Sequence, residues 1–567
     1  MNIKIPNHTT AMKTDIEIAR SVRMKPVTEV ARQLGIAPDD LELYGKYKAK
    51  VPLSYIDREK RKNAKLILVS AISPTPAGEG KTTVSIGLSQ ALNRIGKRSC
   101  VVLREPSLGP VFGLKGGATG GGLSQVLPME DINLHFTGDF AAIEKAHNLL
   151  AALIDNNIQS KTRSLGLDPR TISWKRVMDM NDRSLRHIVA GLGGTASGVP
   201  RETGFDITAA SEVMAILCLA TSIADLKQRL GNIFVGFTYD KKPVYARDLH
   251  AEGAMAALLK DAIKPNLVQT IEGTPALIHG GPFANIAQGT NTVVATQMSL
   301  SLTDYTVTEA GFGFDLGAEK FLDIKCRAAG LSPNAVVLVA TVRALKYHGG
   351  QPLKELKTPD AEALERGIVN LQKHIENIGL FGLSPVVAIN KFATDSDEEL
   401  QFVRDYCTMR GVPCAVADVW GQGGAGTEEL AGLVAETADH CCPQFKPLYP
   451  LDEPVVRKVE TIAKNIYGAE AVDYTPKAKN ALKRIADLGL DALAICMAKT
   501  QKSLSDNPAL LGRPKDFVIT VRDIEIAAGA GFLIPITGEI MRMPGLPEEP
   551  AAEHIDIDDE GNLSGLF

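Results

Sequence analysis

The stretch Ser73 to Thr83 has the residue types and the spacing that can hold a polyphosphate: Ser-Pro-Thr-Pro-Ala-Gly-Glu-Gly-Lys-Thr-Thr. Backbone N–H groups at the start of a helix point at an anion, and the helix dipole favours negative charge there. Lys81 would reach the β- and γ-phosphates, and the Thr82 hydroxyl would coordinate Mg²⁺. The pattern therefore predicts a site for a nucleoside triphosphate.

One position departs from the usual G-x-x-x-x-G-K-[ST] pattern, because Thr75 stands where the first glycine is expected. The alternative is an ordinary turn between a strand and a helix, with a coincidental Gly-Lys pair. The flanking segments favour the phosphate loop. Residues 66–69 form a continuous apolar run, typical of a strand buried on both faces, and apolar residues recur at helical spacing from Val84 to Ile95. Strand, turn and helix are the context that a phosphate loop requires.

Charged residues follow two other predicted strands. Arg104 and Glu105 come directly after Cys100–Leu103, a strand that we expect beside the phosphate-loop strand, where ligands bind in open parallel sheets. The planar guanidinium of Arg104 could bind a carboxylate or a phosphoryl group in transfer, and Glu105 could coordinate a cation. A surface Arg–Glu pair is the alternative. Glu309, after the strand 305–308, stands near the position expected for an acidic residue close to Mg²⁺ and the γ-phosphate.

Seven glycines lie between Gly109 and Gly122, with Lys115 in their midst. Glycine permits positive φ and close backbone approach to a ligand, at an entropic cost. A flexible linker is the alternative. The predicted strands and helices on both sides favour a loop that encloses a substrate.

Two aromatic residues follow two later strands: Phe392 comes after 385–389 and Trp420 after 414–417. Aromatic residues make up only 5% of the chain, and a pair at neighbouring strand ends suggests a slot for a flat heterocycle. Ordinary packing at the strand ends remains the alternative.

Apolar strand candidates alternate with helices along most of the chain, at 66–72, 99–103, 305–308, 336–341, 385–389 and 414–417. Such alternation predicts an α/β fold with a mostly parallel, doubly wound sheet of the phosphate-loop NTPase kind. Between about 140 and 290 the pattern changes to long helical segments, 141–157 and 208–230, around a strand-like 232–237. We therefore predict a discontinuous nucleotide-binding core (1–140 and 290–445), an inserted α/β subdomain (141–289) and a C-terminal α/β subdomain (446–567).

Composition limits the possible partners and the compartment. The 567 residues carry 62 Lys and Arg against 66 Asp and Glu, a net charge of −4, so no global field attracts nucleic acid or an anionic membrane. The longest apolar stretch, 213–224, is too short to span a bilayer and predicts a buried helix. The eight cysteines lack C-x-x-C spacing, and only Cys441 and Cys442 adjoin. Reduced thiols in a cytoplasmic protein are the natural interpretation.

Taken together, the residues resemble the formate–tetrahydrofolate ligase family over nearly the whole chain. Five separated segments carry the resemblance: 75–83, 113–122, 279–285, 308–313 and 339–350. The family joins formate to N10 of tetrahydrofolate while it cleaves ATP, and gives 10-formyltetrahydrofolate, ADP and phosphate by way of formyl phosphate. Some relatives fuse this activity to a further enzyme, but 567 residues imply a stand-alone ligase.

The resemblance also implies roles for individual residues. Lys81, Arg104 and Asp139 are the catalytic candidates, with Arg104 on formate and Asp139 assisting removal of a proton from the amine. Glu105 matches the residue that holds an activating monovalent cation, K⁺ or NH₄⁺. Phe392 and Trp420 match residues that sandwich the folate ring, with Phe312 nearby, where it would contact either folate or the adenine of ATP. The family forms homotetramers. The ATP-binding segment is Thr75, Pro76, Ala77, Gly78, Glu79, Gly80, Lys81 and Thr82.

A phosphate-loop ATPase or GTPase that acts as a conformational switch is the main rival. Asn390-Lys391 resembles the start of a guanine-reading N-K-x-D motif, but Ala393 occupies the Asp position. A switch protein also has no need of an aromatic slot. A non-catalytic scaffold is disfavoured by the intact Lys81 and Thr82.

Overall fold

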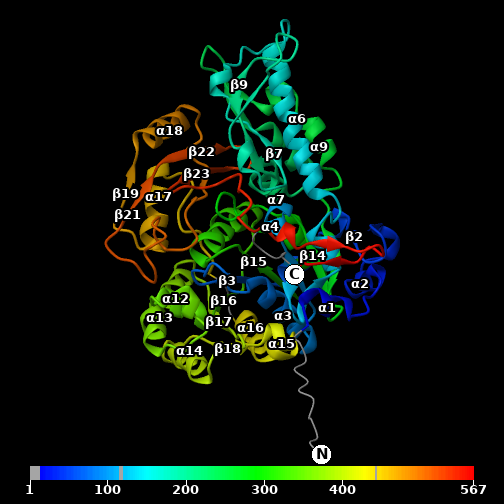
Figure 1. Cartoon of the computed structure of the whole chain (residues 1–567), viewed down its shortest axis with the longest axis vertical. Helices are drawn as coiled ribbons and strands as arrows, with labels where there is room; N and C mark the ends of the chain where they lie inside the picture. The colour runs from blue at the N-terminus through cyan, green and yellow to red at the C-terminus, as the bar shows by residue number, and fades with distance from the viewer. Residues whose placement is uncertain (1–12, 114–118, 441–443, 567) are drawn as a thin grey trace, which may run out of the picture.

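The computed structural model describes residues 13–113, 119–440 and 444–566, and a large sheet runs through the centre of the molecule (Figure 1). Seven strands in a row are parallel, in the order β14-β4-β15-β3-β16-β17-β18. Their bounds are β14 Pro275–Ile278, β4 Ser99–Leu103, β15 Tyr305–Glu309, β3 Lys65–Ala71, β16 Ala335–Ala340, β17 Pro385–Asn390 and β18 Cys414–Ala417. The predicted mostly parallel α/β sheet is confirmed.

Helices cover both faces of this sheet, as a doubly wound fold requires. On one face, α3 (Lys81–Arg94) and α16 (Glu428–His440) pack against each other and against β3. On the other, α10 (Val293–Leu302) lies on β4 and β15, and α13 (Ala361–Leu380) lies on β16 and β17. Side chains of β3 alternate between the two cores, because Ile67 and Val69 join the first and Leu66 and Leu68 the second. Both faces are buried, which explains the unbroken apolar run.

The strand β4 was expected beside β3, and this prediction is wrong. β15 lies between them and pairs with both, with Val307 opposite Ile67 on one side and Val101 on the other. Two fully buried parallel strands look alike in sequence whichever neighbour they have, so alternation of elements does not give their spatial order. As a consequence, Arg104, Glu309 and the phosphate loop follow three adjacent strands in turn.

Short antiparallel strands extend the sheet at one edge. β13 (Asn266–Thr270) forms a hairpin with β14, and β2 (Ala49–Lys50) pairs with β13 and with β1 (Glu42–Leu43). The N-terminal part of the chain thus also supplies strands to the sheet. β13 and β14 fall inside the range 141–289, yet they complete the main sheet. We therefore propose that the inserted subdomain ends before Asn266.

The inserted region extends away from the central sheet (Figure 1, cyan to green), and its hydrophobic core also includes residues of the C-terminal region, among them Ala527, Phe532 and Ile534. The long α6 (Asp139–Gln159) confirms the helix expected over 141–157. The helix expected over 208–230 is instead two, α7 (Glu212–Leu219) and α8 (Ile223–Gly231), because the Ser222 side chain accepts from the Asp225 N–H and starts a new helix. The apolar run 213–224 lies mostly in α7, whose residues 213–219 are buried.

The C-terminal region packs beside the inserted unit (Figure 1, orange). Helices α17 (Val455–Ile462) and α18 (Pro476–Asp487) accompany strands β22 (Asp523–Ala527) and β23 (Phe532–Ile536), and part of this region shares a hydrophobic core with β3 and β16. In the residues that the structure describes, none of the helices combines the length and apolarity needed to cross a bilayer. The six cysteines in the described ranges are free thiols, and the adjoining pair Cys441–Cys442 lies outside those ranges.

Candidate active site

The phosphate loop leaves β3 and turns into α3, which begins at Lys81. Gly78 and Gly80 have φ of 83° and 71°, a conformation that suits glycine. Gly80 also lies so close to Asn390 that a Cβ there would be 2.4 Å from the Asn390 Nδ2. Thr75 does not adopt positive φ. The missing first glycine is therefore compatible with the backbone of this loop.

Side chains at the ends of β16 and β17 hold the phosphate loop by hydrogen bonds to Glu79. The buried Glu79 carboxylate accepts from the Thr75 N–H at 2.7 Å and from the Thr341 hydroxyl, which follows β16. Asn390, at the end of β17, donates from Nδ2 to the Glu79 carbonyl at 3.0 Å. Asn390 therefore has a structural role in the phosphate loop, in place of the guanine recognition that the Asn390-Lys391 sequence suggested.

A cavity of about 290 Å³ opens at the loop and collects most of the predicted catalytic groups. The loop residues Thr75 and Pro76 precede this cavity and do not line it. Its lining consists of residues 77–83 together with Arg104, Gly120, Ala284, Glu309, Gly311 and Phe312. The cavity therefore joins the ends of β3, β15 and β4, the three adjacent strands of the sheet centre.

Glu309 connects the loop to Arg104. Its buried carboxylate accepts from the Thr82 hydroxyl at 2.8 Å through Oε2, and its Oε1 lies 3.7 Å from Arg104 Nη2. Arg104 is about one-quarter exposed and donates from Nη1 to the Pro282 carbonyl at 3.4 Å. The guanidinium thus has partners on one side and faces the cavity on the other. A hydroxyl, a carboxylate and a permanent cation therefore lie together at the wall of this cavity.

Glu105 and Asp139 form a second, deeper group. Both carboxylates are buried, and Asp139 accepts from Lys50 Nζ at 2.7 Å and from Asn266 Nδ2 at 2.8 Å. Burial, reinforced by the negative charge of Asp139, raises the pKa of Glu105 well above its usual range. The Oε2 atom of Glu105 is buried and has no hydrogen-bond partner among the described residues. Asp139 does not line the 290 Å³ cavity.

The three candidate aromatic residues lie in different surroundings. Phe312 lines the cavity and has a φ of 59°, unusual for a residue other than glycine. Phe392 has the Arg343 guanidinium 3.5 Å from its ring centroid, and Trp420 donates to Asp15 at 3.2 Å. Trp420 is 37% exposed, and β17 and β18, the strands before Phe392 and Trp420, are indeed neighbours.

The glycine-rich segment meets Trp420. A Cβ on Gly121 would lie 3.3 Å from the indole, and one on Gly122 would lie 2.1 Å from the Trp420 carbonyl oxygen, so this approach requires glycine. Gly120 lines the cavity on the other side. Lys115, expected within a substrate-enclosing loop, lies outside the described residues. The described part of the segment connects the cavity to Trp420.

Several residues of the site gave no recognisable signal in the sequence. Lys50 and Asn266 contact Asp139 from the edge strands β2 and β13, at separations of 89 and 127 residues. Lys320, fully buried, donates to the Ala284 carbonyl at 2.6 Å. A buried lysine is rare unless it is paired, but the sequence does not show which lysine is buried.

The C-terminal region contributes the support beneath the loop. The Ser73 carbonyl accepts from His348 Nε2 at 2.9 Å, and the Ser73 N–H donates to Asn370 Oδ1 at 3.1 Å. His348 and Asn370 also bind the N–H and the carbonyl of Gly512, at 3.1 and 2.7 Å. Burial lowers the pKa of His374, which contacts the Ser73 hydroxyl, to about 4. The first residue of the phosphate loop is thus tied to the C-terminal region through neutral, buried side chains.

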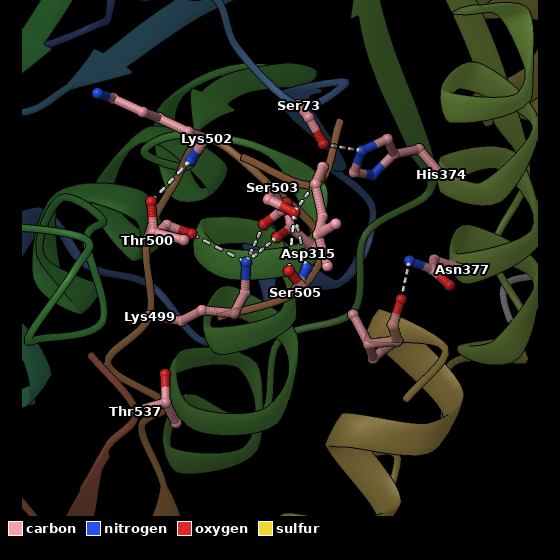
Figure 2. Close-up of polar contacts among 12 residues, drawn as sticks. Ser73, Asp315, His374, Asn377, Lys499, Thr500, Lys502, Ser503, Ser505 and Thr537 are labelled. Atoms are coloured by element: carbon pink, nitrogen blue, oxygen red, sulfur yellow. Dashed lines mark hydrogen bonds and ion pairs between the residues drawn. The ribbon is translucent and has the colours of Figure 1, made fainter. Parts of the chain in front are cut away.

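A buried ion pair lies next to this network (Figure 2). The Lys499 ammonium points at the Asp315 carboxylate at 3.0 Å and also donates to the carbonyls of Thr500 and Ser503. Both charged side chains are no more than 1% exposed, and burial lowers the pKa of Lys499. Asp315 follows Phe312 by three residues, so the pair fixes the segment that lines the cavity.

A comparison with known protein families agrees with this geometry. The family model described as formate–tetrahydrofolate ligase matches residues 13–567. The chain belongs to the formate–tetrahydrofolate ligase family. Formate–tetrahydrofolate ligases use ATP to join formate to tetrahydrofolate, so the chain is an ATP-dependent ligase of one-carbon metabolism and the predicted resemblance is confirmed. The match gives no support to a phosphate-loop switch.

The Lys499–Asp315 pair generates a stability prediction. In the variant Lys499→Met, the Asp315 carboxylate stays buried without a counter-charge, which costs roughly 3–5 kcal/mol. We expect a lower urea midpoint of unfolding, measured by circular dichroism. The double variant Lys499→Met/Asp315→Leu removes both charges and should regain most of the midpoint. An unchanged midpoint in the single variant would contradict the importance of the pair.

Proposed function

We propose that the cavity beside the phosphate loop transfers the γ-phosphoryl group of ATP to formate, and that the resulting formyl phosphate reacts with N10 of tetrahydrofolate. One observation carries this proposal: residues 77–83, Glu309 and Arg104 line the same cavity of about 290 Å³. A phosphate cradle and a carboxylate-binding cation therefore share one space, as an in-line transfer between two anions requires.

The first step needs charge neutralisation more than proton transfer. A formate oxygen attacks the γ-phosphorus, the bond from phosphorus to the bridging oxygen breaks, and ADP leaves with that electron pair. Backbone N–H groups of the loop and Lys81 would stabilise the phosphates. Arg104 would hold the formate carboxylate and afterwards formyl phosphate, because its guanidinium matches both groups geometrically.

Thr82 and Glu309 fit a Mg²⁺ site. Mg²⁺ prefers oxygen ligands and is commonly held by one or two protein groups together with substrate phosphates. The Thr82 hydroxyl and the Glu309 carboxylate, 2.8 Å apart at the cavity wall, supply such oxygens. When bound, Mg²⁺ would neutralise charge on the β- and γ-phosphates.

Glu105 fits the monovalent cation, K⁺ or NH₄⁺. Its buried Oε2 lacks a protein partner among the described residues, and an unpaired buried carboxylate oxygen is costly. A monovalent cation would satisfy this oxygen and would add positive charge next to Arg104, where the acid binds.

The second step joins the formyl group to the folate amine. The N10 lone pair attacks the formyl carbon, a tetrahedral intermediate forms, and phosphate leaves with the electrons of the C–O bond. The amine must also lose a proton, and Asp139 is the candidate acceptor. Lys50 and Asn266 hold both oxygens of that carboxylate, and its charge acts on the neighbouring Glu105. Asp139 therefore belongs to the same electrostatic group as the cation candidate.

Phe392, Trp420 and Phe312 are the candidates for contact with the folate ring. The neighbouring strands β17 and β18 and the exposure of Trp420 support a stacking role. Phe312, on the wall of the phosphate cavity, would lie on the side where folate meets formyl phosphate. Homotetrameric assembly and a cytoplasmic location complete the proposal. Assembly rests on the family resemblance, and the free thiols in the described ranges support the location.

Arg104 tests the first step directly. We expect Arg104→Ala to lower formate-dependent ADP formation by about 10²–10³-fold, because it removes charge stabilisation of the transferring group. Nucleotide affinity, measured by isothermal titration calorimetry, should stay near the wild-type value. Arg98→Ala is the matched control, since Arg98 precedes the same strand at its other end and pairs with Asp304 at the surface. Normal turnover in Arg104→Ala would remove Arg104 from the mechanism.

Glu105 tests the cation site. In Glu105→Gln the side chain keeps its shape but can no longer ionise to a carboxylate when a cation binds, so K⁺ should bind about tenfold more weakly or worse. The rate is measured against KCl at constant ionic strength, with choline replacing K⁺. The exposed Glu202 provides the control variant Glu202→Gln, which should respond to K⁺ as the wild type does. The same K⁺ response in Glu105→Gln would rule out the assignment.

A further inference from the structure

The segment 281–287 contributes residues to the lining of two cavities. Ala284 lines the 290 Å³ cavity with Arg104, whereas Ile286 and Ala287 line a second cavity of about 630 Å³ between the inserted and C-terminal regions. Two alanines three residues apart therefore face two different spaces. Only Ala284 faces the site in which formate is proposed to bind.

The Ala284 methyl group and the Arg104 guanidinium both lie close to Gly311. A Cβ built on Gly311 would lie 2.6 Å from the Ala284 Cβ, 3.0 Å from Arg104 Nη1 and 3.3 Å from Arg104 Nη2. The guanidinium therefore lies over Gly311 with the Ala284 methyl beside it. Ala284 and Gly311 line the cavity together with Arg104, so they limit the space beside the guanidinium.

The Ala284 methyl has no room to withdraw. A Cβ on Gly289 would lie 2.2 Å from the Ala284 Cβ, so the methyl already packs against that backbone. Lys320, which is fully buried, donates to the Ala284 carbonyl at 2.6 Å. The Phe283 N–H donates to the Ala209 carbonyl at 3.0 Å and fixes the preceding residue. The packing against Gly289 and these two hydrogen bonds thus fix the position of the Ala284 methyl group.

We propose that Ala284, with Gly311, determines the size of the acid that the ligase activates and excludes acids larger than formate. This inference rests on the proposed binding of formate by Arg104. Acetate carries the same carboxylate as formate and would form an acyl phosphate by the same bond changes, so charge does not distinguish the two. They differ by one methyl group, and the extra methyl of acetate needs space in the part of the cavity that Ala284 and Gly311 line.

The variant Ala284→Gly tests this inference, since it removes one methyl group where acetate adds one. Each acid is supplied with MgATP and hydroxylamine, which converts an acyl phosphate to a hydroxamate and releases phosphate. We expect the ratio of kcat/KM for acetate to kcat/KM for formate to rise at least about tenfold, as one methyl group in a fitted pocket allows 10–200-fold discrimination. An unchanged ratio would overturn the inference.

Ala287→Gly is the matched control, because it makes the same change in the same segment but faces the other cavity. Its acid preference should equal that of the wild type, and a rise like that of Ala284→Gly would overturn the inference by pointing to loosening of the segment. Formate turnover in Arg104→Ala distinguishes failure of the size limit from failure of the proposed formate site. If Arg104→Ala is inactive and Ala284→Gly keeps the wild-type ratio, the size limit fails and the formate site stands. If Arg104→Ala remains active, the formate site itself fails.

Discussion

The contact of Glu309 with both Thr82 and Arg104 is the interaction on which the site depends. ATP and formate are both anions, and bringing them together in a partly buried space costs free energy unless positive charge and hydrogen bonds are already in place. One carboxylate, 2% exposed at the end of β15, orients the hydroxyl of the phosphate loop and lies next to the guanidinium that faces the cavity. The strand order β4-β15-β3 makes this possible. Arg104 follows β4, Glu309 ends β15 and the phosphate loop follows β3, so all three lie at the same edge of the sheet.

The rest of the chain keeps this edge rigid. Asn390 and Thr341, from the strands on the far side of β3, hold Glu79 and thus the loop. The C-terminal region reaches the base of the loop through Gly512, His348 and Asn370. Because these groups are buried and hydrogen-bonded, a shift of the C-terminal region would displace Ser73 as well. Regions far apart in the sequence therefore hold the phosphate loop in place together.

Much of the fold could be predicted from the sequence because its signals are local. The apolar run before Ser73, the Gly-Lys-Thr sequence and the helical spacing after it lie within thirty residues, and the structure has a strand, a turn and a helix there. The order of β4 and β15 could not be predicted, since buried parallel strands carry no mark of their neighbours. The hairpin β13–β14 was missed because its first strand contains Asn266, Gln269 and Thr270, polar residues whose partners lie far away in sequence. The roles of Lys50, Lys320 and Ala284 depend on such distant contacts, and the assignments of Asp139, Phe392 and Trp420 remain predictions.

A crystal structure with a non-hydrolysable ATP analogue, Mg²⁺, formate and a folate analogue would test the central claim most directly. The account predicts the γ-phosphate at Lys81 and Thr82, formate on the cavity side of Arg104, and the folate ring against Trp420 or Phe392. Nucleotide density away from residues 77–83, or formate density remote from Arg104 while the γ-phosphate occupies the loop, would contradict it.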